Sequence, residues 1–137
     1  MKNYRDTVIY KKNRQRPKFL NLLQIRLPVT AVASILHRVS GVILLMVLPV
    51  VIYGLDLSLQ GREGFEQVIS MIQSPVGQLV FVLISTSIFY HLIAGIRFLL
   101  LDVDIGYSLA AARWTARIVI IISIIVMLVL VTGVFIS

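Results

Sequence analysis

Three long apolar stretches divide the chain, and polar residues gather before and between them. The first covers residues 27–55 and is interrupted by His37 and Arg38, the second covers 76–101, and the third covers about 116–137. About 20 helical residues at a rise of roughly 1.5 Å cross the hydrocarbon core of a bilayer. Each stretch is long enough, so the pattern predicts an all-α integral membrane protein with three transmembrane helices.

The polar segments predict how these helices are connected. Residues 1–26 form a basic arm that we expect on the cytoplasmic membrane surface or against a partner. Residues 56–74 have the composition of an exposed loop with room for one short surface helix. Pro49 is expected to kink the first helix, and Arg97, near the end of the second, is expected to snorkel toward the interface.

Composition narrows the class of protein further. Hydrophobic residues make up 58% of the chain and charged residues 14%, and the mean hydropathy is +0.95, which excludes an ordinary soluble domain. The net charge of +7 indicates membrane topology and not nucleic-acid binding, because most of it precedes the first long apolar run. The positive-inside rule then predicts a cytoplasmic N-terminus and a periplasmic C-terminus. Nine of the 13 Lys and Arg residues lie at or before position 38: Lys2, Arg5, Lys11, Lys12, Arg14, Arg16, Lys18, Arg26 and Arg38.

The chain has no cysteine, so it supplies neither disulfides nor thiolate ligands for metals or iron–sulfur clusters. The first 18 residues are basic and lack a long apolar run, so we expect no cleavable signal or transit peptide.

His91 is the candidate for chemistry inside the membrane, since an ionisable residue in a spanning helix is a functional-site hypothesis by default. Ser87, His91 and Gly95 are spaced i, i+4, i+8, and Ala94 lies beside them. Small residues around an imidazole would admit a flat macrocycle whose iron the histidine ligates. The same small residues are equally typical of a helix-packing surface on which His91 only forms a hydrogen bond.

His37 is the second histidine, and we expect it near the cytoplasmic start of the first helix. His91 lies eleven positions before Asp102, or roughly 16 Å along a helix, so the depths of the two histidines do not match. A second axial ligand is therefore expected from another chain. His37 and Arg38 are better placed for haem propionates, although an interfacial histidine beside a snorkelling arginine explains them as well.

Ser34 and Arg38 are spaced i, i+4 on the first helix. A hydroxyl and a guanidinium near the membrane surface can donate to a quinone carbonyl and stabilise the charge that develops on reduction. Alone, this pair is weak evidence for a quinone site, because the Ser34 hydroxyl can equally donate to the main-chain carbonyl of Thr30, four residues earlier.

Two segments carry a resemblance to a known family. They are RPKFLNLLQIRLPVTAVASILHRVSG (Arg16–Gly41) and HLIAGIRFLLLD (His91–Asp102). In this order, and on the first and second helices, they resemble the cytochrome b membrane-anchor subunits of bacterial succinate dehydrogenase. The resemblance runs from Arg16 to the C-terminus, with Phe98 standing where many relatives have a second histidine.

The resemblance implies a role for each candidate residue. His91 would be an axial ligand of haem b, whose other ligand lies on a second small anchor subunit, and the three helices would be half of a heterodimeric bundle. Ser34 and Arg38 would contact ubiquinone, and His37 with Arg38 would lie near the haem propionates.

The implied complex also contains a flavoprotein and an iron–sulfur subunit, which pass electrons from succinate in a bacterial inner membrane. The isolated chain would have no activity. Two alternatives stay open, namely an anchor of a quinol:fumarate reductase and a cofactor-free helical subunit of another membrane assembly.

Overall fold

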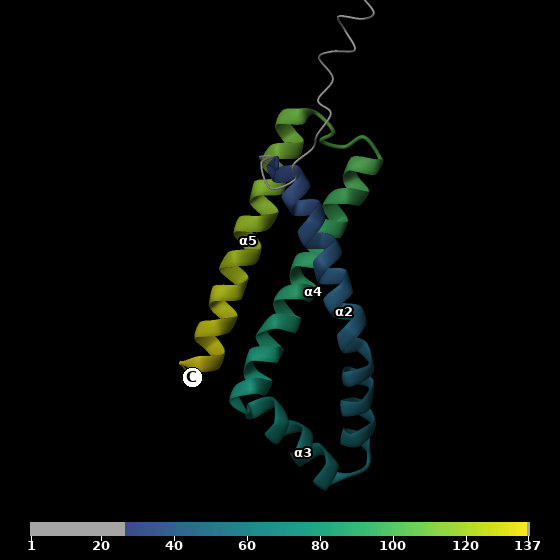
Figure 1. Ribbon diagram of the computed structural model, residues 1–137, viewed down its shortest axis with the longest axis vertical. Coiled ribbons are helices and arrows are strands. Elements are labelled where there is room, and N and C mark those ends of the chain that lie inside the picture. Colours follow the sequence, from purple (N-terminus) through teal and green to yellow (C-terminus); the bar gives the residue numbers. More distant parts are fainter. Residues whose placement is uncertain (1–26, 137) are drawn as a thin grey trace, which may run out of the picture.

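The computed structural model describes residues 27–136, which fold into helices joined by short turns. The basic arm predicted for residues 1–26 and the final residue lie outside the described residues. Three of the helices are long and apolar enough to cross a membrane, which confirms the predicted fold class. The helices are α2 (Val29–Leu59), α3 (Arg62–Gln73), α4 (Pro75–Asp102) and α5 (Leu109–Phe135) (Figure 1).

The boundaries differ from the predicted ones mainly at the third spanning helix. It begins at Leu109, seven residues before the predicted start, and carries Arg113 and Arg117 in its first turns. The prediction followed the charge-free run, but hydropathy reports burial in lipid and says little about where a helix begins. The actual start is set by Ser108, whose hydroxyl accepts a hydrogen bond from the Ala111 amide at 3.3 Å.

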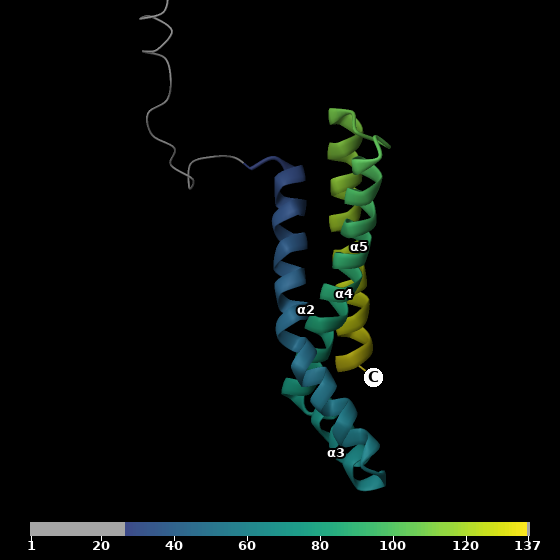
Figure 2. The ribbon, with the colours of Figure 1, turned by 90° about the vertical axis from the view of Figure 1, so that its right-hand side faces the viewer.

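The three spanning helices lie side by side, and α4 packs against both α2 and α5. The turn between α4 and α5 lies at the same end as the start of α2, whereas α3 bridges α2 and α4 at the opposite end (Figure 1). Figure 2 shows that α2 changes direction in its second half, as expected for a helix with an internal proline, here Pro49.

The corner between α3 and α4 is built by Ser74, Pro75 and Gly77. The Ser74 hydroxyl caps α4 by accepting from the Gly77 amide at 3.0 Å, and Pro75 occupies the first helical position, where its missing N–H costs no helical bond. A Cβ on Gly77 would collide with the Met71 carbonyl oxygen. A glycine is therefore required for α3 to turn this tightly into α4.

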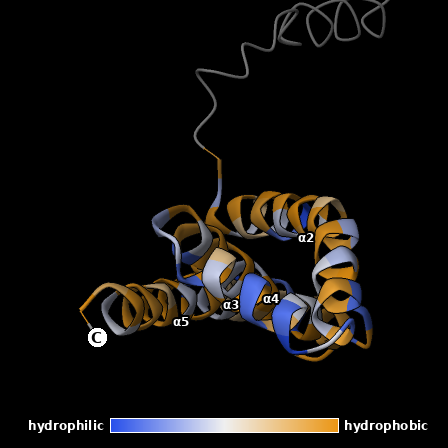
Figure 3. Ribbon diagram, turned by 90° about the horizontal axis from the view of Figure 1, so that it is seen from below, coloured by the Kyte–Doolittle hydropathy of each residue, from blue (hydrophilic) through white to orange (hydrophobic). Residues whose placement is uncertain are grey.

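The core between the spanning helices consists mostly of small residues, as is common where membrane helices approach closely. Large apolar side chains instead face outward, and Figure 3 shows how hydrophobic residues prevail along α2 and α5. The buried residues of the described part of the chain are Ala33, Ser40, Gly64, Val82, Ser87, Tyr90, Ala94, Arg97, Ala116, Val119 and Ser123.

Arg97 does not snorkel, contrary to the sequence prediction. It is 6% exposed, and its guanidinium donates from Nε to Thr115 Oγ1 at 3.0 Å and from Nη2 to the Ala112 carbonyl at 2.8 Å. Both acceptors are on α5, which starts early enough to lie beside Arg97. The arginine thus joins α4 to α5 inside the protein.

Tyr90 joins α4 to α2 in a similar way, since its buried hydroxyl donates to the Ala33 carbonyl at 2.9 Å. We predict that Tyr90→Phe lowers the free energy of unfolding by about 1 kcal/mol, because a phenyl ring keeps the packing and loses one buried hydrogen bond. Thermal unfolding of the detergent-solubilised protein measures this. Tyr107→Phe is the control, since Tyr107 is exposed in the α4–α5 turn and should show no change. Equal effects of both substitutions would contradict the assignment.

Candidate functional site

The two histidines meet where α2 crosses α4. The ring centroids of His37 and His91 are 4.1 Å apart and the ring planes differ by 9°, so the imidazoles are stacked face to face. This contact corrects the predicted mismatch in depth. His37 lies about 12 Å along α2 from Val29, and His91 lies roughly 16 Å along α4 from Asp102, so both histidines are at a similar distance from the same end of the bundle.

Each histidine rests on a glycine of the opposite helix. A Cβ on Gly41 would lie 3.0 Å from His91 Cε1, and a Cβ on Gly95 would lie 3.4 Å from His37 Nε2. Both helices therefore use the same pattern, a histidine followed four residues later by a glycine. Among the small residues near His91, Gly95 thus lies at the close helix contact, where His37 covers it.

His91 is held through Nδ1. This atom lies 3.1 Å from the main-chain carbonyl oxygen of His37 and 3.1 Å from Ser40 Oγ. A carbonyl oxygen only accepts hydrogen bonds, so Nδ1 carries the hydrogen. In a neutral imidazole the lone pair is then on Nε2, and no hydrogen bond from residues 27–136 engages that atom.

This donor set fits a haem. Histidines that ligate metals usually donate their other ring N–H to a carbonyl or carboxylate, which fixes the tautomer. Within residues 27–136 no three His, Cys, Asp or Glu side chains gather as a metal site. A macrocycle that brings its own nitrogen ligands needs only an axial donor from the chain, and His91 Nε2 is suited to that role.

Ser34 and Arg38 lie one turn apart on α2. Ser34 is partly buried and Arg38 is exposed, and within residues 27–136 neither side chain forms a hydrogen bond or ion pair. The Ser34 hydroxyl therefore does not satisfy the carbonyl of Thr30. Among residues 27–136, no other functional side chain bonds to either polar group.

Phe98 and Ser40 complete the surroundings of the histidines. Phe98 meets the His37 ring edge-on, with 5.2 Å between ring centroids. Ser40 was missed in the sequence analysis, although it follows His37 by three residues and so lies close to it on the helix surface. That spacing was the signal that could have identified it.

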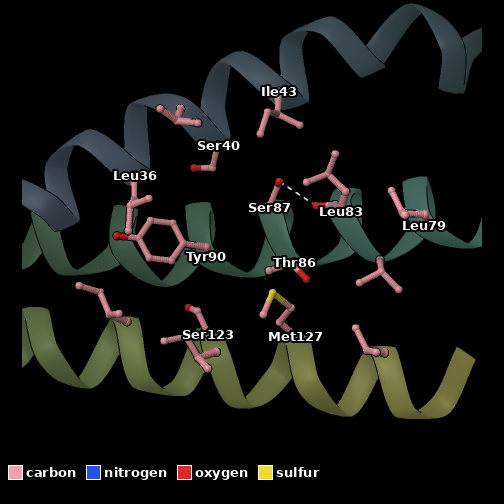
Figure 4. A pocket seen from close by; sticks show the side chains of 15 residues that line it. Leu36, Ser40, Ile43, Leu79, Leu83, Thr86, Ser87, Tyr90, Ser123 and Met127 are labelled. Carbon is pink, nitrogen blue, oxygen red and sulfur yellow. Dashed lines mark hydrogen bonds between the residues drawn. The ribbon is translucent and has the colours of Figure 1, made fainter. Parts of the chain in front are cut away.

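A cavity of about 480 Å³ lies next to this contact, between α2, α4 and α5 (Figure 4). Its wall is almost wholly apolar, although Thr86 Oγ1 is buried there without a hydrogen-bond partner among the described residues. The sequence predicted only Ser87 on this face, because the other walls depend on how the helices pack. The hydroxyl-bearing lining residues are Ser40, Thr86, Ser87, Tyr90 and Ser123.

Comparison with known proteins identifies a matching family and several relatives over most of the chain. Residues 12–131 match the family described as succinate dehydrogenase/fumarate reductase transmembrane subunit. The chain is 31% identical over 113 residues to the succinate dehydrogenase cytochrome b556 subunit of Coxiella burnetii, covering 81% of this chain and 90% of that protein. The same-named subunits of Rickettsia felis and Rickettsia prowazekii are each 30% identical over 116 residues, covering 85% of this chain and 90% of theirs.

The close helix contact at Gly41 generates a prediction. Gly41→Ala should be less stable than Gly54→Ala by about 1–3 kcal/mol, because its added methyl presses on the His91 ring. Both substitutions improve helix propensity alike, and a Cβ on Gly54 meets no atom within 4 Å. Thermal unfolding of the two variants measures the difference. Identical stabilities would show that the crossing has room for a methyl group at Gly41.

Proposed function

The chain belongs to the succinate dehydrogenase/fumarate reductase transmembrane subunit family, and we propose that it is the haem b-binding membrane anchor of a succinate:quinone oxidoreductase. The observation that carries this proposal is the state of His91, whose Nδ1 is bonded to the His37 carbonyl while Nε2 keeps its lone pair. The names of the relatives from Coxiella and Rickettsia, which are cytochrome b556 subunits, support the haem.

His91 would hold the haem iron as one axial ligand, and the second ligand would come from a second small anchor subunit. A haem held by both histidines of this chain would have to lie between their two rings. The rings of His37 and His91 are in direct face-to-face contact, so no macrocycle fits between them as they stand. The stacked rings therefore support a second ligand from a partner subunit. When bound, the haem would supply a one-electron redox centre within the membrane.

Arg38 would act at the edge of the site, where it is exposed on α2. A guanidinium there can pair with a haem propionate through charge-assisted hydrogen bonds. His37 would contribute from the neighbouring position, with its ring stacked on that of His91.

Ser34 and Arg38 would together bind the headgroup of ubiquinone. The serine hydroxyl can donate to one carbonyl oxygen, and the arginine stabilises the negative charge that develops on that oxygen as electrons arrive. Both groups have unused hydrogen-bonding capacity within the described residues, as a binding site for an external substrate requires.

The electrons would come from succinate through a flavoprotein and an iron–sulfur subunit, docked on the cytoplasmic face of a bacterial inner membrane. The end of the bundle that holds the start of α2 and the α4–α5 turn would face the cytoplasm, supported by Arg113 and Arg117 at that end. The family also includes fumarate reductases, but the relatives compared above are named for succinate dehydrogenase.

The alternative function is that of a cofactor-free subunit, in which His91 is only a packing residue. A cofactor-free subunit would use the histidine contact only to hold α2 against α4, and the bonds to Ser40 and the His37 carbonyl suit that role as well. The two functions differ in whether the assembled protein contains a b-type haem.

We predict that the purified complex shows the sharp reduced-minus-oxidised bands of a b-type haem. His91→Gln should lose most of them, because the iron loses an axial donor. The matched substitution His37→Gln should retain them, since His37 is not a ligand in this proposal. Wild-type complex without such bands would disprove the haem assignment, and equal loss in both variants would remove the distinction between the histidines.

We predict that Arg38→Leu and Ser34→Ala slow quinone reduction by roughly a hundredfold, the size expected when a donor to a developing oxyanion is removed. Succinate oxidation with an artificial dye should persist, because that electron path ends before the quinone. Arg117→Leu and Ser70→Ala are controls on exposed residues elsewhere in the chain. Equal loss of the quinone and dye activities would indicate failed assembly and contradict a quinone site.

A further inference from the structure

We propose that Ser40 is a positioning residue for His91: together with the His37 carbonyl, its hydroxyl holds the imidazole as the Nδ1–H tautomer and tunes the haem that His91 ligates. The inference rests on the proposed haem function. It concerns a residue that lies on α2, whereas the ligand itself lies on α4.

The hydrogen atoms of this contact can all be assigned. Ser40 Oγ lies 2.8 Å from the His37 carbonyl oxygen, and the hydroxyl must be the donor because the carbonyl can only accept. Ser40 Oγ can then accept a hydrogen bond from His91 Nδ1, which lies 3.1 Å away. The Nδ1 hydrogen is therefore shared between two acceptors, the serine oxygen and the carbonyl oxygen.

The opposite tautomer is disfavoured by the same geometry. A bare Nδ1 would place its lone pair 3.1 Å from the carbonyl oxygen of His37, which has no hydrogen to offer. Ser40 alone could donate to such a nitrogen, but it would then give up its own bond to the carbonyl. The triangle of Nδ1, Oγ and carbonyl oxygen thus favours one state of the imidazole, with Nε2 as the ligating atom.

Ser40 differs in this respect from the other buried serines of the described chain. Ser87 donates to the Leu83 carbonyl and Ser123 to the Val119 carbonyl, each at 2.8 Å and each four residues back on its own helix. Only Ser40 among these three forms a hydrogen bond with a side chain of another helix. The three are buried alike, with 4% to 6% exposure, so burial does not explain the difference.

Burial strengthens the hydrogen bond between Ser40 and His91. Ser40 is 4% exposed, so the hydrogen bond lies in a region of low dielectric where little water competes for it. Gly41, the next residue, lets α2 approach the His91 ring closely enough for the hydroxyl to reach Nδ1. Hydrogen bonds to the N–H of a ligating histidine orient the ring and raise its basicity, and basic axial ligands favour the oxidised iron.

The test uses the assembled complex and compares Ser40→Ala with Ser87→Ala and Ser123→Ala. The readouts are the haem-to-flavin ratio, the affinity for haem and the fraction of haem reduced at a fixed ambient potential. We expect Ser40→Ala alone to lower haem affinity by about tenfold, the lower end of the effect of losing such a supporting bond. It should also raise the reduced fraction at a given potential, and Ser40→Thr, which keeps a hydroxyl, should restore both.

An unchanged haem affinity and potential in Ser40→Ala would overturn the inference, and so would equal shifts in all three alanine variants, which would indicate packing. Should Ser40→Ala fail to accumulate, Ser40→Cys keeps the size of the side chain with a weaker acceptor and should give an intermediate shift in potential. A wild-type complex without haem bands would overturn the haem function itself, whereas haem bands that are indifferent to Ser40 would overturn only this inference.

Discussion

The close crossing of α2 and α4 is the contact on which the rest of the structure depends. At this crossing His37 of α2 lies on Gly95 of α4, and His91 of α4 lies on Gly41 of α2. The two imidazole rings stack on each other between the helices. A methyl group at Gly41 would press on the His91 ring, whereas one at Gly95 would only make an ordinary contact with His37. Because the crossing is tight, the His37 carbonyl comes within hydrogen-bonding distance of a side chain on the opposite helix.

Lipid imposes a second constraint, since polar groups in the hydrocarbon layer find no water. The chain answers it by using buried polar side chains as links between helices. Tyr90 bonds to the backbone of α2, and Arg97 bonds to α5. The same requirement explains why Ser87 and Ser123 turn back to their own helix carbonyls. The histidine contact is thus one of several polar links in a core that otherwise consists of small residues.

The two sides of α2 differ in a way that suits the proposed function. The side toward α4 carries His37 and Ser40 in fixed contacts, whereas Arg38 is exposed and Ser34 is half-buried without a hydrogen bond among the described residues. A redox cofactor benefits from a rigid ligand, and a substrate that binds and leaves benefits from donors that are free to meet it. In the proposed function, one helix would therefore support the cofactor site and the quinone site with different faces.

The sequence by itself determined the number of spanning helices, their approximate positions and the residues capable of chemistry, because hydropathy and side-chain chemistry are local properties. His91 stood out since an imidazole is costly in lipid, and Ser34 and Arg38 stood out through helical spacing. Only the tertiary structure decided which residues meet. The stacking of His37 on His91, the bond of Ser40 to Nδ1 and the burial of Arg97 beside α5 depend on where helices start and how closely glycines let them approach. A one-dimensional pattern contains neither quantity, so His37 was placed at the wrong depth and Ser40 was missed.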